Sequence, residues 1–338
     1  MAEVGIIGAS GYTGVELLRL CAQHPNLEVR VATGDSQAGT AAAELYPSVA
    51  AAYPGLVFSA YDPASVAGLD LVFLGLPHGA SQRIVPELLG KVGHLVDLAA
   101  DFRLRDAALY PQWYGEPHTA PELLGDFAYG LPELFREAIL AADHVAVPGC
   151  YPTAAALALA PLVQAGVVER TGIVVDAASG ASGAGRPAKP STTFCTVDED
   201  FTAYSLLDHR HTPEMEQVLG ASVLFTPHLA PMSRGILATC YARPAGPTST
   251  DALLALLRSA YRDEPFVVVT DGSPSTKATL GSNCAHVTAR HDERTGWVVA
   301  IAAIDNITKG ASGAAVQCAN LLLDLPETAG LPMAGVYP

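Results

Sequence analysis

The sequence predicts an α/β protein of two domains: a parallel, doubly wound sheet and an inserted α+β domain with a mainly antiparallel sheet. Two observations support this. Strands and helices alternate over the first half of the chain, and strands dominate after Gly166. Alternation favours a parallel sheet with helices on both faces, whereas runs of strands favour antiparallel pairing. We expect one domain from residues 1–149 and 310–338, and a second from 150–309.

The composition excludes several classes of partner. The chain has 338 residues, half of them hydrophobic, and a net charge of −15, which argues against nucleic acid or an anionic membrane surface. Its six cysteines are dispersed without a CxxC pair or zinc-ligand spacing, so we expect no metal and a reducing cytoplasm. The first residues lack the basic n-region of a signal peptide, so we do not expect one here. The most apolar helix, near 153–168, is expected to break at Pro161 and to be too short for a membrane.

The first strand, at 4–7, is followed by a glycine loop and by the helix-like run 15–20. Strand, glycine loop and helix together are the context of a dinucleotide site, because glycines let the backbone approach the pyrophosphate at the helix N-terminus. A tight turn that serves packing alone is the alternative. The candidate cofactor residues here are Gly8, Ser10, Gly11, Tyr12, Thr13 and Gly14. We therefore expect a Rossmann-like first domain.

The second strand, 27–32, ends in Thr33-Gly34-Asp35-Ser36. In a Rossmann-like fold this end meets the adenosine ribose. Asp35 suits the 2′-hydroxyl of NAD, whereas Thr33 and Ser36 suit the 2′-phosphate of NADP. Local chemistry leaves the choice between the coenzymes open.

Three further strands are expected at 69–74, 94–98 and 144–147, with a helix at about 80–89. Ligands bind at the carboxyl ends of parallel strands. Four residues of interest follow strand ends: Gly11, His78, Arg103 and Cys150. The sequence therefore predicts that the site lies at this edge of the sheet.

Cys150 stands at a strand-to-helix turn. Pro148-Gly149 ends the strand, and Pro152 begins an Ala- and Leu-rich run that favours a helix. Unpaired N–H groups and the helix dipole favour a thiolate at such a position. The alternative is a small buried core cysteine. We take Cys150 as the candidate nucleophile.

The second half of the chain is strand-rich. Strands are expected at 172–176, 223–226, 235–242, 266–270, 284–291 and 296–304, with helices at 212–219 and 251–262. Residues 292–295 give a hairpin signal between the last two strands. A final helix opens near Gly310, runs to Leu323 and is expected to return to the first domain.

A histidine just before the 212–219 helix is the candidate acid–base. A cysteine nucleophile needs a group that titrates near neutral pH, and His211 supplies one on a loop that precedes the helix start. One alternative is that His209, on the same loop, takes this role. The other is that His211 is a surface histidine that only satisfies nearby backbone groups. Arg186 and Arg210 are candidate anion ligands, or partners in structural ion pairs.

Eight segments, in order and nearly end to end, resemble N-acetyl-gamma-glutamyl-phosphate reductase, an NADP-dependent enzyme family of arginine biosynthesis. These segments are Gly8–Gly14, Leu76–Gly79, Asp101–Leu104, Pro148–Thr153, Ser179–Arg186, His209–Gln217, Asp305–Asn306 and Lys309–Ala311. The Pro148–Thr153 and His209–His211 blocks are specific to the family, whereas many enzymes share the glycine loop.

The resemblance implies a small acyl-phosphate substrate and NADP(H). It implies that Cys150 is the nucleophile and His211 the acid–base. Arg103, His209, Arg210 and Arg186 would bind substrate, and Ser36, Pro77, Ser182, Gly183 and Asn306 would line the cofactor site. It further implies that the second domain holds the catalytic groups and forms a homo-oligomer, a dimer or a tetramer.

Two departures from the family pattern stand out. Thr33-Gly34-Asp35-Ser36 lacks the usual arginine between serines, and Ala178 occupies a position where lysine is common. Acyl-chain length also stays open, because one methylene is worth only about 1–3 kcal/mol in a pocket. The same chemistry on an N-substituted aminoadipyl phosphate of lysine biosynthesis is one alternative. A Cys–His acyl hydrolase without a redox step is another.

Overall fold

The computed structural model describes residues 1–337, which form two compact units. Unit 1 comprises 1–148 and 311–331, and unit 2 comprises 149–310 together with 332–337. The C-terminal residues from 332 onward thus group with unit 2, whereas the sequence assigned all of 310–338 to the first domain. Backbone hydrogen bonds account for this, since Asn283 N–H donates to Pro332 O at 2.8 Å and Val336 N–H to Leu280 O at 2.7 Å.

Unit 1 contains a six-stranded parallel sheet in the order β2-β1-β3-β4-β6-β5. Its strands are β1 (Ala2–Ile7), β2 (Leu27–Ala32), β3 (Leu71–Leu74), β4 (His94–Asp97), β5 (Phe127–Tyr129) and β6 (His144–Ala146). The predicted parallel sheet is confirmed. The order reverses beside β1, and such a switch point is where open α/β sheets bind ligands.

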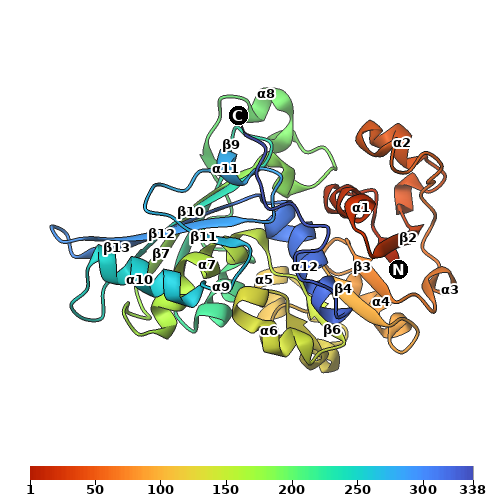
Figure 1. The fold of residues 1–338 in the computed structure, drawn as a ribbon. Helices are drawn as coiled ribbons and strands as arrows, with labels where there is room; N and C mark the ends of the chain where they lie inside the picture. Colours follow the sequence, from red (N-terminus) through yellow and green to blue (C-terminus); the bar gives the residue numbers. More distant parts are fainter. Residues whose placement is uncertain (338) are drawn as a thin grey trace. The chain divides into compact units, whose positions relative to one another are not determined.

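The helices of unit 1 follow the strand ends. They are α1 (Tyr12–Gln23), α2 (Ala42–Leu45), α3 (Pro63–Val66), α4 (Ser81–Leu88), α5 (Tyr110–Tyr114), α6 (Pro132–Leu140) and α12 (Gly313–Leu322). The last helix contacts α1, α6 and β4, so it does return to the first unit as expected (Figure 1). Because α12 is hydrophobic and nearly all buried, it completes the layer over this sheet.

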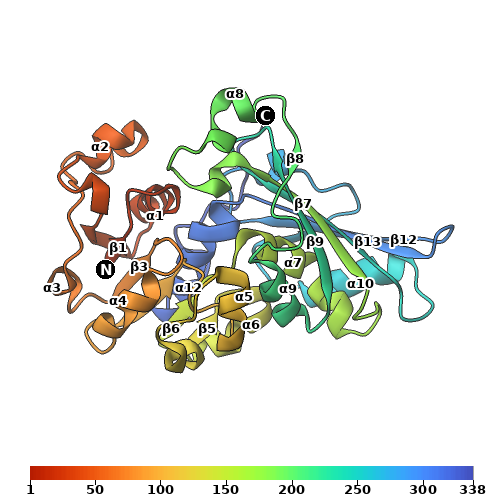
Figure 2. The same cartoon turned by 180° about the vertical axis from the view of Figure 1, so that it is seen from behind.

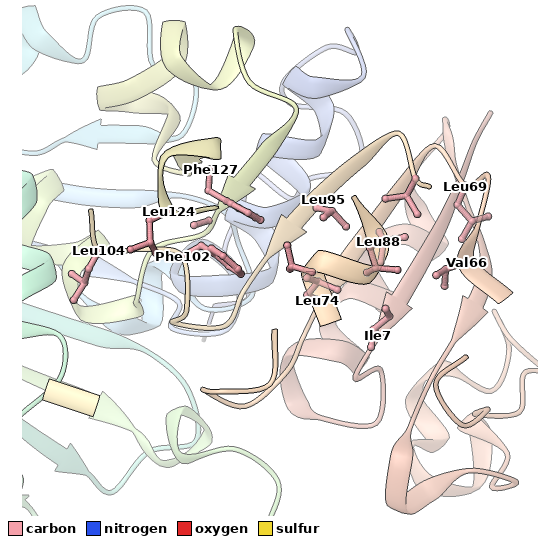
Figure 3. Close-up of a cluster of buried hydrophobic side chains, with 14 of the residues drawn as sticks. Ile7, Val66, Leu69, Leu74, Leu88, Leu95, Phe102, Leu104, Leu124 and Phe127 are labelled. Atoms are coloured by element: carbon pink, nitrogen blue, oxygen red, sulfur yellow. The ribbon is translucent and has the colours of Figure 1, made fainter. Parts of the chain in front are cut away.

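A hydrophobic cluster joins the sheet of unit 1 to the segments that cross it (Figure 3). Leu74 and Leu95 come from adjacent strands, Leu88 comes from α4, and Phe102 stacks on Phe127 with ring centroids 4.2 Å apart. The stacked pair anchors the loop after β4, which carries Arg103. Core packing therefore fixes one of the loops at the carboxyl edge of the sheet.

Unit 2 contains a seven-stranded mixed sheet in the order β11-β12-β13-β10-β7-β9-β8. Its strands are β7 (Ile173–Gly180), β8 (Thr202–Ala203), β9 (Val223–Ala230), β10 (Ile236–Ala242), β11 (Val267–Val269), β12 (Ala285–Asp292) and β13 (Trp297–Ile304). Four of the six pairings are antiparallel, so the expected mainly antiparallel sheet is confirmed. Its helices are α7 (Cys150–Gln164), α8 (Phe194–Val197), α9 (Thr212–Leu219), α10 (Thr250–Ala260) and α11 (Thr276–Thr279).

Helices α7, α9 and α10 pack against this sheet (Figure 2). Helix α7 is buried almost throughout and runs on to Gln164, although a break at Pro161 was expected. A proline cannot donate to the carbonyl four residues earlier, which here belongs to Leu157. Tyr261 replaces the missing donor, because its hydroxyl donates to Leu157 O at 2.7 Å. The helix therefore tolerates Pro161. Over the described residues, no helix is long and apolar enough to cross a membrane.

Candidate active site

Cys150 is the first residue of α7, as the strand-to-helix pattern predicted. Gly149 is the N-cap residue of the helix and has an extended backbone. As a glycine it offers no side chain to accept a hydrogen bond from the N–H groups of the first turn. The side chain of Cys150 is half-buried, and Gly310 lies directly against it. A Cβ at Gly310 would come within 2.8 Å of Cys150 Cβ, so only glycine fits here without displacement. Gly310, at the end of the long segment 149–310 of unit 2, thus packs against the cysteine at its beginning.

A buried carboxylate fixes the turn before Cys150. Glu214, in the first turn of α9, is fully buried, and its Oε1 accepts from Gly149 N–H at 2.7 Å. This is a charge-assisted hydrogen bond between segments 65 residues apart. It orients the peptide immediately before the nucleophile. The sequence analysis assigned Glu214 only to the helix start.

His211 lies beside the same glycine. It is buried, and a Cβ at Gly149 would come within 2.5 Å of His211 Nε2. The glycine therefore leaves the space that the imidazole fills beside the residue preceding Cys150. The helix begins at Thr212, as predicted, and His211 is its cap. Pro213 is consequently the second helical residue, still inside the first turn that tolerates proline.

His209 has a different environment. Its Nδ1 accepts from His211 N–H at 3.1 Å, which leaves the proton of a neutral ring on Nε2. Its ring contacts Tyr151, Tyr204 and Phe225 at centroid distances of 5.7, 5.6 and 5.2 Å. Burial, and then the charge of Arg210, lowers the pKa of His209 to about 4. His209 therefore stays neutral near pH 7, the range in which His211 is expected to act.

The loop after β7 is tied to the turn after β13. Asn306, 2% exposed, accepts through Oδ1 from Gly235 N–H at 2.7 Å and donates through Nδ2 to Ser182 Oγ at 3.0 Å. Gly183 is exposed beside this pair. The structure therefore brings together Ser182, Gly183 and Asn306, which the sequence singled out as cofactor residues from segments over a hundred positions apart.

In unit 1 the glycine loop has the geometry of an anion cradle. Gly8 has a φ of +88°, and a Cβ there would lie 2.3 Å from Gly75 O, so this position needs glycine. A Cβ at Gly14 would lie 2.4 Å from the backbone of Ala9. At Gly11 the nearest atom would be 3.6 Å away. Gly8 and Gly14 are therefore required by the fold, whereas Gly11 leaves open space at the start of α1.

The N-terminus of α1 is available to an anion. It has no acidic residue in its first turn and no side-chain cap. Tyr12 and Thr13 are its first residues and are half-buried. Ser10 is buried, and its hydroxyl donates to Gly34 O at 3.2 Å, which joins the loop to the end of β2. Ser36 and Pro77, at the ends of β2 and β3, are exposed.

The candidate anion ligands differ in their settings. Arg103, in unit 1, is buried and donates through Nε to Val147 O at 2.7 Å and through Nη2 to Leu98 O at 2.8 Å. It thus links the ends of β4 and β6. Arg186 is half-buried and Arg210 is exposed, both in unit 2. Among residues 1–337, no group of three or more His, Cys, Asp and Glu side chains could hold a metal ion.

Sequence reasoning missed Glu214, Gly310 and the Tyr151–Tyr204 pair. Tyr204 Oη donates to Tyr151 Oη at 3.1 Å, and Tyr151 Oη donates to His228 O at 3.0 Å. These contacts join residues that are 50 or more positions apart, and no local pattern signals them. The Thr-Pro-Glu helix start did mark Glu214, but only as a residue near the helix dipole.

Two family models match the chain. One, described as the semialdehyde dehydrogenase NAD binding domain, covers residues 3–142. The other, described as the semialdehyde dehydrogenase dimerisation domain, covers residues 150–306. The same fold occurs in an aspartate semialdehyde dehydrogenase from Candida albicans solved with NADP. That match has a TM-score of 0.73 at 15% identity and covers 96% of this chain and 99% of the other.

An aspartate semialdehyde dehydrogenase II from Vibrio cholerae gives a TM-score of 0.71 at 17% identity, covering 96% of this chain and 98% of the other. Curated relatives are much closer in sequence. An N-acetyl-gamma-glutamyl-phosphate reductase from Symbiobacterium thermophilum is 51% identical, over 99% of both chains. Proteins of the same name from Desulforudis audaxviator and Ectopseudomonas mendocina are 49% and 47% identical, over 100% of both chains. The chain therefore belongs to the N-acetyl-gamma-glutamyl-phosphate reductase family of the semialdehyde dehydrogenases.

Proposed function

We propose that this protein reduces N-acetyl-gamma-glutamyl phosphate to N-acetylglutamate 5-semialdehyde with NADPH and releases phosphate, as a step of arginine biosynthesis. The observation that carries the proposal is the arrangement around Gly149: Cys150 begins a helix, and His211 fills the space beside the preceding residue. A nucleophile with an adjacent base is the requirement for acyl transfer. Full-length relatives that share the name of this reaction support the substrate assignment.

The first half-reaction is acyl transfer to sulfur. His211 takes the thiol proton of Cys150, and the thiolate forms a bond to the acyl carbon. The carbon–oxygen bond to phosphate then breaks, and the proton leaves His211 with the phosphate. Backbone N–H groups in the first turn of α7 have no acceptor within the helix, so they stabilise the developing oxyanion. In other acyl-transfer sites one such donor contributes about 3–4 kcal/mol.

The second half-reaction reduces the thioester. NADPH, when bound, supplies the hydride that adds to the thioester carbon. The chain's own part is to hold that carbon on Cys150 and to stabilise negative charge on its oxygen until the carbon–sulfur bond breaks. The aldehyde leaves, and the sulfur departs as a thiolate that regains a proton from solvent. A thioester accepts hydride far more readily than a carboxylate, which explains why the reaction passes through a covalent intermediate on Cys150.

The residues present fit NADP(H). The uncapped N-terminus of α1 and the open space at Gly11 suit a pyrophosphate. We assign Gly8, Ser10, Gly11, Tyr12, Thr13, Gly14, Ser36 and Pro77 to the dinucleotide in unit 1. Ser182, Gly183 and Asn306, held together by the Asn306–Ser182 hydrogen bond, complete the assignment in unit 2. The exposed Ser36 beside Asp35 would face the 2′-position of the ribose.

Cations are assigned to the anionic substrate. Arg103, Arg186 and Arg210 would bind its carboxylate and phosphate, since guanidinium groups make forked hydrogen bonds to both. Arg103 already uses two donors on backbone carbonyls. The plane of its guanidinium group is therefore held in a fixed orientation. His209 would contribute a neutral Nε2–H donor rather than a proton.

The second unit would also make the oligomer, a dimer or a tetramer. Helices α7, α9 and α10 cover one face of its sheet, and every second residue on the central strands is only partly buried. These residues include Val174, Leu237, Tyr241, Val299 and Ile301. An apolar face of this kind suits a second copy of the chain. We place the enzyme in the cytoplasm, where its six free cysteines stay reduced.

The test is the reverse reaction, followed at the nicotinamide absorbance. Wild-type protein should reduce NADP with N-acetylglutamate semialdehyde in continuous turnover only when phosphate is present, and Cys150→Ala should be inactive. The semialdehyde one carbon longer and NAD are run in parallel to decide chain length and coenzyme. Reduction that favours the longer substrate would overturn the arginine assignment. No reduction with any pair would overturn the reductase, leaving the Cys–His hydrolase as the leading explanation.

A further inference from the structure

Two buried aspartates of unit 1 share a single hydroxyl group. Ser81 Oγ lies 2.9 Å from Oδ2 of Asp97 and 2.9 Å from Oδ2 of Asp101. All three residues are 0% exposed. A serine hydroxyl has one proton to donate, so it can satisfy only one of these contacts. The other short oxygen–oxygen contact requires a proton that a carboxyl group supplies.

The surroundings decide which carboxyl group holds the proton. Asp101 accepts from Gly79 N–H at 2.8 Å and Gln82 N–H at 3.0 Å, and its Oδ1 lies 2.6 Å from His78 Nδ1. Gln82 is in the first turn of α4, where the helix dipole favours a negative charge. Within residues 1–337, Asp97 accepts one backbone N–H, from Ala99 at 3.0 Å. Asp101 is therefore the ionised member.

Electrostatics supports this division. Burial, and then repulsion by Asp101, raises the pKa of Asp97 to about 7. Burial also disfavours the charge on Asp101, but the contacts of His78, Gly79 and Gln82 outweigh it and lower the pKa of Asp101. The two carboxyl groups are thus held in different protonation states below neutral pH.

We propose that Asp97, Ser81, Asp101 and His78 form a chain that shares one proton between two carboxyl groups and positions the loop that carries Arg103. Asp97 donates to Ser81 Oγ, Ser81 donates to Asp101, and His78 Nδ1 lies in ion-pair contact with Asp101 Oδ1. These hydrogen-bonded residues join the loop after β3 to the loop after β4, which leave adjacent strands at the carboxyl edge of the sheet.

Arg103 is the proposed substrate ligand that these hydrogen-bonded residues position. Val147 N–H donates to the backbone oxygen of Asp97 at 2.7 Å, and Arg103 bonds to Val147 O and Leu98 O. Asp97 and Arg103 therefore hold the same short segment, three residues before Cys150 in the sequence. When Asp97 loses its proton, two carboxylates repel each other beneath that segment. We infer that Arg103 is then held less firmly.

Other groups face the chain from the elements packed around it, and they set its charge balance. These groups are Arg103, Tyr110, Tyr114, Glu116, His118 and Glu122. His118 donates through Nε2 to Asp101 O at 2.8 Å and accepts through Nδ1 from Ala120 N–H at 3.1 Å, which fixes it as a neutral ring. Arg103 is the permanent cation among them, and its charge lowers the pKa of Asp97, but burial and repulsion by Asp101 outweigh it.

The direct test is an infrared titration of the whole protein without substrate. The wild type should show the carbonyl band of a buried carboxylic acid at pH 6 that disappears as the pH rises through 7, and Asp97→Asn should lack it. Ser81→Ala should keep the band but shift its frequency, because the acid loses its acceptor. Asp143→Asn, at an exposed aspartate of the same unit, is the control and should match the wild type.

Absence of the band in the folded wild type, or its persistence in Asp97→Asn, would overturn the proposal. An unshifted band in Ser81→Ala would also overturn it, because Ser81 would not be the acceptor. If Asp97→Asn fails to fold, Ser81→Ala and the wild type still decide the matter. None of these readings depends on turnover, so they stand apart from the test of the reductase.

A kinetic consequence rests on the proposed reduction and on Arg103 as a substrate ligand. Above pH 7 the wild-type KM for the semialdehyde should rise more than kcat falls. In Asp97→Asn this rise should be at least halved, because asparagine donates to Ser81 at every pH. An identical KM profile in both proteins would show that the chain does not position Arg103.

Discussion

Glu214 Oε1 accepts the N–H of Gly149 at 2.7 Å, so a buried carboxylate sits at the start of the helix that Cys150 begins. The negative charge of Glu214 disfavours a thiolate at the helix start, but it favours a positive charge on His211, the proposed acceptor of the thiol proton. Glu214 thereby positions Gly149, and in the proposed mechanism it would stabilise the ion pair formed by proton transfer.

Glu214→Gln should keep the shape of the site and remove its charge. Because a hydrogen bond to a charged group contributes about 1.5–3 kcal/mol, we expect kcat to fall about 10- to 100-fold. The pH profile of Cys150 alkylation should shift at the same time, with NADPH binding unchanged. Glu216→Gln, which removes the charge of the half-buried side chain that accepts from Val223 N–H, is the matched control in the same helix. Equal kinetics in the two variants would assign Glu214 a purely structural role.

Gly149→Ala should displace His211. The new methyl group would lie 2.5 Å from His211 Nε2, whereas the φ of −65° at this position suits alanine. We expect activity to fall at least about tenfold with little change in thermal stability, since the backbone is unstrained. Gly246→Ala, where a Cβ meets nothing within 4 Å, is the control in the same unit. Wild-type activity in Gly149→Ala would mean that His211 is not the base.

Gly11→Ala and Gly14→Ala should separate binding from folding. A Cβ at Gly14 lies 2.4 Å from Ala9, so this variant should lose thermal stability. At Gly11 the nearest atom is 3.6 Å away, so the fold should be unaffected. NADPH should nevertheless bind Gly11→Ala at least about tenfold more weakly, because the methyl group fills space at the helix N-terminus. Nucleotide titration and thermal unfolding measure the two effects, and unchanged NADPH affinity would move the pyrophosphate elsewhere.

Tyr261→Phe should destabilise α7. The carbonyl of Leu157 would lose the donor that compensates for Pro161, at a cost of about 1–3 kcal/mol in the free energy of unfolding. Pro161→Ala restores a backbone donor to that carbonyl, so the same tyrosine substitution should cost less than half as much in that background. A double-mutant cycle by urea unfolding measures the coupling. Equal costs in both backgrounds would show that Tyr261 acts by packing alone.

His209 should make stability depend on pH in a defined window. Its pKa in the folded protein is lowered to about 4, mainly by burial, from an ordinary value of 6.5. Between these values the unfolded chain binds more protons, so stability falls as the pH falls from about 6.5 to about 4. His209→Gln should weaken this decline, as followed by unfolding at several pH values. The variant should also keep activity at neutral pH, because His211 is the proposed acid–base residue, and loss of that activity would reverse the two roles.

Much of the fold could be predicted because its signals are local. The strand 27–32 and the helix Thr212–Leu219 match their predicted bounds, since apolar patterns and a Thr-Pro start mark them directly. The three-residue strand β5 (Phe127–Tyr129) escaped prediction because it is too short to show a period. Its place is set by pairing with β6 rather than by its own sequence.

Contacts between distant segments explain the remaining differences. A proline in a helix predicts a break, and nothing local announces that Tyr261, a hundred residues later, supplies the missing hydrogen bond. Likewise, the pattern around Cys150 identifies a reactive turn, but the carboxylate that orients it comes from another helix. The candidate residues could be found from their motifs, whereas the groups that hold them in place could not.

The central claim is that Cys150 carries the acyl group, and a burst experiment tests it most directly. Wild-type enzyme, N-acetylglutamate semialdehyde and NADP are mixed without phosphate, and NADPH is followed by absorbance. We predict one NADPH per active site, a matching acyl adduct on Cys150 by mass spectrometry, and steady turnover once phosphate is added. Steady NADPH formation without phosphate, or a burst that survives in Cys150→Ala, would contradict the thioester account.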